Sequence, residues 1–222
     1  MKKFKFSSIA TLFALLILVG CSDPADKVHK SAASDPAKLE PARDATPPAT
    51  TSKEYVVRGS STIRFVGSKV TGKHDGGFKN FAGTISVADG KIVGLPVIQI
   101  NMKTIWADNE KLTGHLKSAD FFDVQKYPMA TFTATSIEPA DGQCKMTGNL
   151  DLHGVTKSIS FPAKIEVTDD AVTLEADFAI NRKDFNVNYP GKQNDLIRDN
   201  VILKLAIKAT PGAARPEDQI AN

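Results

Sequence analysis

The chain has 222 residues, of which 41% are hydrophobic, and it carries 28 lysines and arginines against 25 aspartates and glutamates. Three of the basic residues are Lys2, Lys3 and Lys5, so positive and negative charges balance over the rest of the chain. This balance leaves no basic stripe and argues against a nucleic-acid partner.

The first twenty residues have the pattern of an export signal. After the basic start, residues 9–20 form an apolar run of 12 residues, shorter than the roughly 20 that a membrane-spanning helix needs. Residues 18–21 (LVGC) resemble the bacterial lipobox, in which the cysteine sulfur is acylated. We therefore expect a lipoprotein signal peptide at 1–20 and a membrane anchor at Cys21. Ser22 after the cysteine favours the periplasmic face of the outer membrane, and Asp23 one place later weakens that expectation.

Two segments have compositions that do not favour a packed core. Residues 21–52 contain five prolines and no aromatic residue, which predicts a disordered tether behind the lipidated cysteine. Residues 211–222 predict a disordered tail. One domain is expected between them, over 53–210. Cys144 is its single cysteine, so it must rely on its core rather than on a disulfide.

The dominant hydrophobic period in this domain is two. Residues 143–152 alternate without exception between apolar or small side chains and polar ones, which is typical of a strand with one buried face. Nine strands are predicted, at 55–58, 63–70, 81–87, 97–102, 130–137, 143–152, 158–167, 174–180 and 201–208. Turn dipeptides at 89–90, 141–142, 153–154 and 169–170 favour antiparallel neighbours.

A sheet of this length must cover its apolar face and its edges. Closure predicts an all-β fold, an antiparallel barrel of about eight strands, which can be filled with side chains or hold one small ligand. Residues 108–122 break the period, because Leu112, His115, Leu116, Ala119 and Phe122 recur at helical spacing. A short helix of about three turns near one end of the barrel is expected, as a lid or as a plug.

The residue types that carry catalysis are sparse in the domain. His74, His115 and His153 lie far apart and form no HxxxH or HExxH pair, and no GxSxG or glycine-rich phosphate loop occurs. Cys144 has the parity of the apolar strand face and is expected to be inert. The sequence therefore predicts no catalytic residue, no metal, no cofactor and no enzyme activity.

Three ordered motifs carry a resemblance to a known family. Residues 114–128 (GHLKSADFFDVQKYP) with 130–132 (ATF), residues 148–157 (GNLDLHGVTK) and residues 181–185 (NRKDF) are similar to signatures of the YceI family of polyisoprenoid-binding proteins. The resemblance covers about residues 53–210. It implies a lipocalin-like barrel with a hydrophobic interior that holds a long isoprenoid or fatty chain.

The resemblance also implies ligand contacts in the lid region and on the dry strand faces. The expected contacts in the lumen or lid are His115, Leu116, Phe121, Phe122, Phe132, Met146, Gly148, Leu150, Phe161, Ala176 and Phe178. The chain departs from the family pattern at two places. Lys111 stands where an arginine is usual before the histidine, and Asn186 stands where a glycine is usual, which suggests altered turn geometry there.

The leading hypothesis is a protein that binds and sequesters or carries a hydrophobic isoprenoid-type lipid, such as a polyisoprenoid or quinone-like molecule, without changing it. One alternative is an enzyme that modifies a small molecule or lipid inside the same barrel. Another is a filled barrel that acts in interaction or stress protection. The expected partners are the lipid and the membrane, and a homodimer is kept as an alternative.

Overall fold

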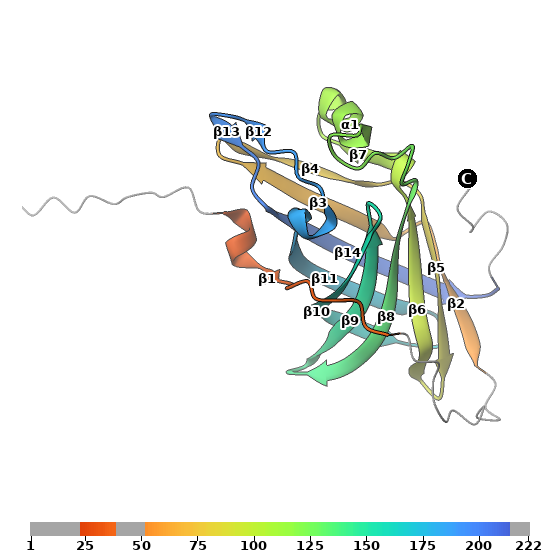
Figure 1. Ribbon diagram of the computed structural model, residues 1–222. Helices are drawn as coiled ribbons and strands as arrows, with labels where there is room; N and C mark the ends of the chain where they lie inside the picture. The colour runs from red at the N-terminus through yellow and green to blue at the C-terminus, as the bar shows by residue number, and fades with distance from the viewer. Residues whose placement is uncertain (1–22, 39–51, 214–222) are drawn as a thin grey trace, which may run out of the picture.

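The computed structural model describes residues 23–38 and 52–213, and these form one antiparallel barrel with a cap at one end (Figure 1). Eight strands follow one another around the ring, and pairing of the first with the last closes it. In ring order they are β11 (Val172–Asn181), β10 (Val155–Val167), β9 (Gln143–Leu152), β8 (Met129–Ala140), β6 (Lys91–Asn101), β5 (Phe81–Ala88), β2 (Lys53–Val57) and β14 (Asn200–Pro211). The predicted all-β barrel of about eight strands is confirmed.

Tight turns connect the successive strands as the sequence indicates. Asp89, Asp141 and His153 have φ values of 51°, 41° and 53°, and each is followed by a glycine that also has positive φ. Such pairs form the two-residue turns whose twist matches that of a hairpin. The Asp169–Asp170 turn is closed differently, by hydrogen bonds between Thr168 and Ala171.

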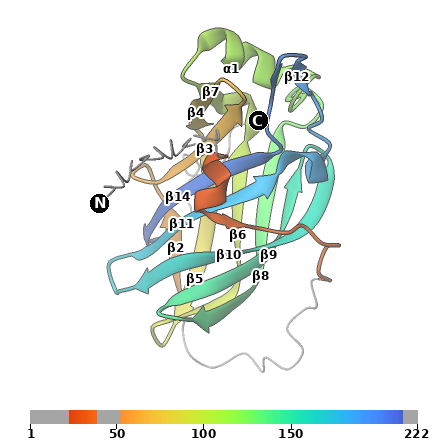
Figure 2. The same cartoon turned by 90° about the vertical axis from the view of Figure 1, so that its left-hand side faces the viewer.

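The cap is built where β14 passes from one partner strand to the next. Its residues 209–211 pair with β2, whereas residues 202–206 pair with β3, which continues past the ring. The elements of the cap are β3 (Thr62–Lys69), β4 (Gly72–Phe78), η2 (Met102–Thr104), β7 (Ile105–Ala107), α1 (Glu110–Lys117), η3 (Arg182–Phe185), β12 (Gly191–Lys192) and β13 (Asp195–Leu196). In Figures 1 and 2 α1 and β12 lie at the same end of the barrel.

The helix in the cap is shorter than expected. Asn109 caps α1 by accepting a hydrogen bond from the Leu112 N–H at 3.0 Å, and Ser118 ends it in an extended conformation. The helix therefore has eight residues, and the predicted third turn is replaced by a chain reversal in which the Phe122 N–H donates to the Leu116 carbonyl. Phe121 and Phe122 thus face the barrel from a turn rather than from a helix.

One seam of the barrel is not closed by its own strands. β10 and β11 pair over only four residue pairs, from Lys164↔Glu175 to Val167↔Val172, and then separate. Residues 29–37 fill the gap on the outer side (Figure 2). In this segment, β1 (His29–Lys30) runs parallel to β11, and Ser34 exchanges two 3.0 Å backbone hydrogen bonds with Ser158 of β10.

Residues 23–38 therefore contradict the prediction of a disordered tether over 21–52. We call them the strap. Its first turn, η1 (Pro24–Lys27), buries Ala25 against Val66, Ala179 and Ile202. The unpaired edges of β10 and β11 offer backbone groups with which the strap forms hydrogen bonds. The gain from these bonds outweighs the strap's lack of large apolar residues.

The limits of the domain also shift slightly. Pro211 still pairs with Tyr55, and the Gly212 N–H donates to the Glu54 carbonyl at 3.1 Å, so the expected tail does not begin at 211. Residues 1–22, which include the predicted signal peptide and Cys21, lie outside the described residues, as do residues 39–51 and 214–222. Within the described part of the chain, none of the helices has the length and apolar character needed to cross a membrane.

Candidate ligand cavity

The barrel interior contains a cavity of about 450 Å³, within the range of cavities that hold small ligands. Nearly all of its wall is apolar, because every ring strand except β2 contributes inward-facing aliphatic or aromatic side chains. Lining residues on the strands include Ile63, Phe65, Ile85, Ile98, Ile100, Phe132, Met146, Leu150, Phe161, Leu174, Phe178, Leu203 and Leu205. Of the two interiors that the sequence left open, one filled with side chains and one hollow, the structure has the hollow one.

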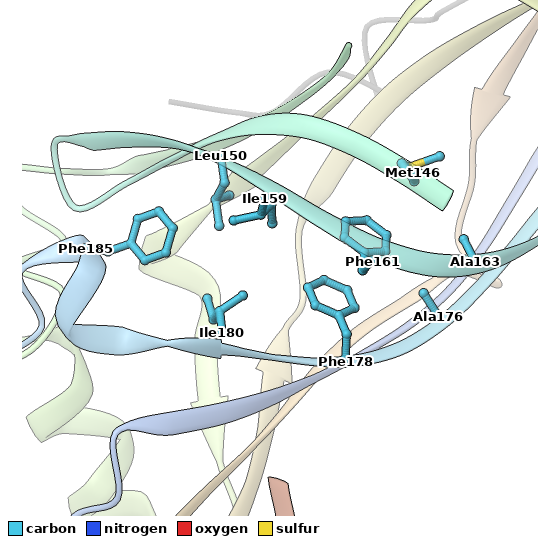
Figure 3. Close-up of a cluster of buried hydrophobic side chains, with 9 residues drawn as sticks. All are labelled: Met146, Leu150, Ile159, Phe161, Ala163, Ala176, Phe178, Ile180 and Phe185. Atoms are coloured by element: carbon cyan, nitrogen blue, oxygen red, sulfur yellow. The ribbon is translucent and has the colours of Figure 1, made fainter. Parts of the chain in front are cut away.

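Part of the wall is a packed cluster of nine buried residues on β9, β10, β11 and η3 (Figure 3). Phe161 of β10 and Phe178 of β11 stack face to face, with ring centroids 3.9 Å apart and ring planes 1° from parallel. These two strands do not pair with each other at this level. The stacked rings therefore close the seam from inside, where the strap closes it from outside.

The polar groups of the cavity lie at the cap end. They belong to β3, β4, α1, η3, the β12–β13 hairpin and the segment before it, and are Ser68, Lys69, His74, His115, Arg182, Tyr189, Lys192 and Asp195. Lys192 is the one exposed residue among those that line the cavity, so the cavity reaches the surface beside it. The cavity thus has an apolar body and a polar mouth between α1 and the β12–β13 hairpin.

Nine of the eleven predicted contacts line this cavity: His115, Leu116, Phe121, Phe122, Phe132, Met146, Leu150, Phe161 and Phe178. Gly148 and Ala176 do not, although both have the inward parity. A Cβ on Gly148 would lie 2.3 Å from the Phe132 ring and 2.6 Å from the Thr133 carbonyl, so this glycine makes room for Phe132. Ala176 is buried within the wall cluster.

His115 lies at the mouth among aromatic rings. Its ring contacts Phe121 and Tyr189 edge-on, with centroids 4.9 Å away in each case, and its Nε2 is 2.8 Å from the Asp120 carboxylate. A histidine hydrogen-bonded to a carboxylate can transfer protons. However, Asp120 is exposed and points to solvent rather than into the lumen, so this pair is a rim contact.

Arg182 is one of the lining residues that sequence reasoning missed, although it lies in the NRKDF motif. Its side chain is buried, and it donates to the carbonyls of Arg198, Val187 and Ile197 at 3.1, 2.5 and 3.3 Å. Burial lowers the pKa of the guanidinium, and Asp199 at 3.6 Å opposes that shift. Arg182 therefore fixes the loop that carries β12 and β13 over the mouth.

Asn186, which stands where a glycine is usual, lies in the turn that follows η3. Asn186 has φ 58° and ψ 19°, the left-handed conformation that glycine adopts easily, and its N–H donates to the Lys183 carbonyl. Asparagine tolerates this conformation better than most residues with a Cβ. Phe185, just before this turn, is fully buried in the wall cluster.

The described residues offer little for metal or redox chemistry. No three histidine, cysteine, aspartate or glutamate side chains among them are grouped as a metal site requires. His74 and His153 lie apart, one 2.8 Å from Asp108 and the other 3.2 Å from the Phe185 carbonyl. Cys144 is free and half-buried near the far end of β9, and it does not line the cavity.

The fold and the apolar cavity define a lipocalin-like barrel. The sequence matches the YceI-like domain over residues 55–209, and the chain belongs to this family. Curated relatives include proteins named YceI from Salmonella arizonae and Salmonella paratyphi B, each 35% identical over 119 residues, which is 50% of this chain and 62% of the relative. The matched region thus spans less than two thirds of the length of these relatives.

Solved structures show the same barrel. BcnA of Burkholderia cenocepacia has a TM-score of 0.61 at 23% identity and covers 68% of this chain and 97% of its own. A polyisoprenoid binding domain from Saccharophagus degradans has a TM-score of 0.59 at 16% identity, with 73% and 100% covered. The YceI protein of Campylobacter jejuni has a TM-score of 0.55 at 25% identity, with 63% and 85% covered.

Proposed function

We propose that this domain binds a hydrophobic isoprenoid-type lipid in its barrel and sequesters or carries it in the cell envelope. The observation that carries the proposal is the cavity of about 450 Å³, with its apolar body and its polar groups gathered at one mouth. A ligand with a long apolar chain and one polar end matches this distribution. Burial of several hundred Å² of chain at about 25 cal/mol per Å² would supply the affinity.

The nature of the lipid is inferred from the family. The Saccharophagus degradans structure is described as a polyisoprenoid binding domain, and its barrel is like this one. A polyisoprenoid or a quinone with an isoprenoid tail would place its chain among Phe132, Phe161 and Phe178, and its polar end near His115 and Lys192. Lys111, which replaces the family arginine, is exposed and lies outside the lining, so no headgroup role is assigned to it.

The proposed location in the cell rests on residues 18–22, which resemble a lipoprotein processing site. Acylation of Cys21 would fix the protein to a membrane by two or three fatty chains, each methylene contributing about 0.8 kcal/mol. The periplasmic face of the outer membrane is the proposed location, on the basis of Ser22. Catalysis is not part of the proposal, because the two histidines on the lining, His115 and His74, each pair with an exposed carboxylate at the cap end, those of Asp120 and Asp108.

Gly67 offers a direct test of the cavity. It lines the lumen on β3, and a Cβ built on it meets no atom within 4 Å, so Gly67→Leu adds bulk to the cavity without a clash. Gly72 has equally free surroundings at the start of β4 but does not line the cavity, so Gly72→Leu is the matched control. We expect Gly67→Leu to lose bound lipid severalfold and Gly72→Leu to keep it.

The measurement is native mass spectrometry of the Cys21→Ser chain, with bound hydrophobic mass counted per folded protein after incubation with undecaprenol. Circular dichroism at each preparation confirms that both variants fold. Equal lipid content in the two leucine variants, or no uptake by the parent protein, would contradict the proposal. A bound metal or turnover of the probe would instead support the enzyme alternative.

A further inference from the structure

Large hydrophobic side chains are exposed at only three places in the described residues: Val70 at 51%, Leu196 at 49% and Leu95 at 45%. Two of the three lie side by side. Val70 follows β3 in the β3–β4 turn, Leu196 ends β13, and the Val70 N–H donates to the Leu196 carbonyl at 3.2 Å. We call residues 69–73 together with 192–196 the prong.

The prong is held together by polar contacts within it. The Asp195 carboxylate accepts hydrogen bonds from the Lys69 ammonium and from Thr71, whose N–H and Oγ1 lie at 3.1 and 2.9 Å. These contacts lower the pKa of Asp195, with the Lys69 hydrogen bond as the main cause. The two hairpin tips are therefore joined at neutral pH, and the exposed apolar pair is fixed in one place.

The prong borders the mouth of the cavity. Lys69, Lys192 and Asp195 all line the cavity, and Lys192 is where it reaches the surface. A lipid that enters or leaves by this mouth passes along the side of the prong. The charges of the prong are Lys69, Lys73 and Lys192 against Asp195, so its sum is positive and suits anionic lipid headgroups.

The strap brings the beginning of the chain to the same side. Ala25 is buried against Val66 of β3, and Asp26 is near enough to Arg198 for the two charges to interact, two residues beyond Leu196. Both views show η1 beside β3 (Figures 1 and 2). Only residue 22 separates Cys21 from Asp23, and two residue steps span at most about 7 Å. An acylated Cys21 would therefore hold this side of the barrel at the bilayer surface.

We propose that the prong is a bilayer contact: Val70 and Leu196 enter the headgroup region of the membrane that anchors Cys21, and the cavity mouth faces that membrane. The occupant of this apolar surface is the lipid bilayer, chosen because the surface is small, flanked by lysines and close to the acylation site. This inference rests on the proposed function, since a contact at the mouth serves a lipid that is exchanged with the bilayer.

The test uses residues 22–222, so that neither an acyl anchor nor the apolar run at 9–20 masks weaker binding. Flotation with vesicles of phosphatidylethanolamine and phosphatidylglycerol compares the parent, the Val70→Ser/Leu196→Ser variant and Leu95→Ser. Leu95→Ser removes the third exposed side chain, which lies on β6 away from the prong. We expect about a tenfold loss of vesicle affinity in the double variant, from the apolar area lost, and no loss in the control.

The salt dependence of vesicle binding and the uptake of undecaprenol are measured alongside flotation. Raised salt should weaken binding of the parent, because lysines at an exposed surface are screened. Equal flotation of parent and double variant, or an equal loss in Leu95→Ser, overturns the bilayer contact. Uptake of undecaprenol from detergent micelles decides the proposed function separately: a parent that takes up none overturns that function, while normal uptake with unchanged flotation overturns the prong alone.

Discussion

Arg182 shows how one buried cation determines the shape of the cavity mouth. Its guanidinium donates to three carbonyls on the loop between η3 and β14, and no apolar side chain could replace those bonds. A planar group with five donors in a fixed arrangement suits three acceptors around one point. The residue also contributes to the cavity wall, so the order of the loop and the shape of the lumen depend on the same side chain.

We predict that Arg182→Met lowers the free energy of unfolding by about 2–4 kcal/mol, because one buried and two partly buried carbonyls lose their charged donor. Lys183→Gln is the control, since the Lys183 side chain is exposed and its ammonium forms an ion pair with Asp199, at 2.9 Å. An exposed ion pair of this kind contributes about 0–1 kcal/mol. Urea unfolding followed by circular dichroism measures both, and similar losses in the two variants would refute the role assigned to Arg182.

At the scale of elements, the strap changes how the domain is defined. The barrel is incomplete without it, because Ser158 and Ser160 of β10 direct backbone groups into the seam. Ser34 bonds both backbone groups of Ser158, the Ser31 hydroxyl accepts from the Ser160 N–H at 3.1 Å, and His29 Nε2 contacts the Ser160 carbonyl at 3.2 Å. The family match begins at residue 55, so the strap lies outside the matched region.

We predict that Ser34→Pro lowers the free energy of unfolding by about 1–3 kcal/mol, since proline cannot donate to the Ser158 carbonyl. Ser34→Ala keeps the N–H and should differ from the parent by less than about 0.5 kcal/mol. Hydrogen exchange at the Ser158 amide should be faster in the proline variant, because its acceptor is the Ser34 carbonyl. Unchanged exchange in Ser34→Pro would mean that the strap does not close the seam in solution.

The strands that the sequence predicted are those with one solvent-exposed face and one buried face. All nine predicted strands exist, and β9 keeps the predicted bounds of 143–152. β4 was not among them, because its Gly76 and Gly77 lie where a Cβ would meet Phe65 and Trp106, so close packing replaced the alternation. The strap could not be predicted from its own composition, since its order depends on a gap between two strands distant in sequence.

The cavity was predictable only in part, for a similar reason. Alternation identifies the inward face of a strand but not which inward residues reach the lumen. Gly148 and Ala176 have the right parity, yet one lies beneath Phe132 and the other within the wall cluster. Of the mouth residues, Lys69 lies at the end of a predicted strand, whereas Lys192 lies in a hairpin with no apolar period. Their place at the mouth depends on the Lys69–Asp195 contact between the tips of the two hairpins.

On the scale of the whole molecule, the barrel combines a rigid wall with an apolar space that side chains do not fill. Filled interiors gain contact energy that a cavity forgoes, and the loss scales with the empty volume. A barrel with a cavity of about 450 Å³ is therefore less stable empty than a packed one of the same size. A bound lipid would restore those contacts, so ligand binding and folding stability should be linked in this protein.

The last prediction follows from that linkage. A ligand that binds only the folded state stabilises it by about 2.7 kcal/mol when its free concentration is 100 times its dissociation constant. We expect the Cys21→Ser chain to unfold at a lower urea concentration after extraction of bound lipid, and to regain its midpoint when undecaprenol is added. Gly67→Leu should show neither change, because its side chain occupies the space that the lipid would fill. A midpoint that is the same with and without lipid in the parent would show that the cavity does not hold this ligand, whatever the barrel resembles.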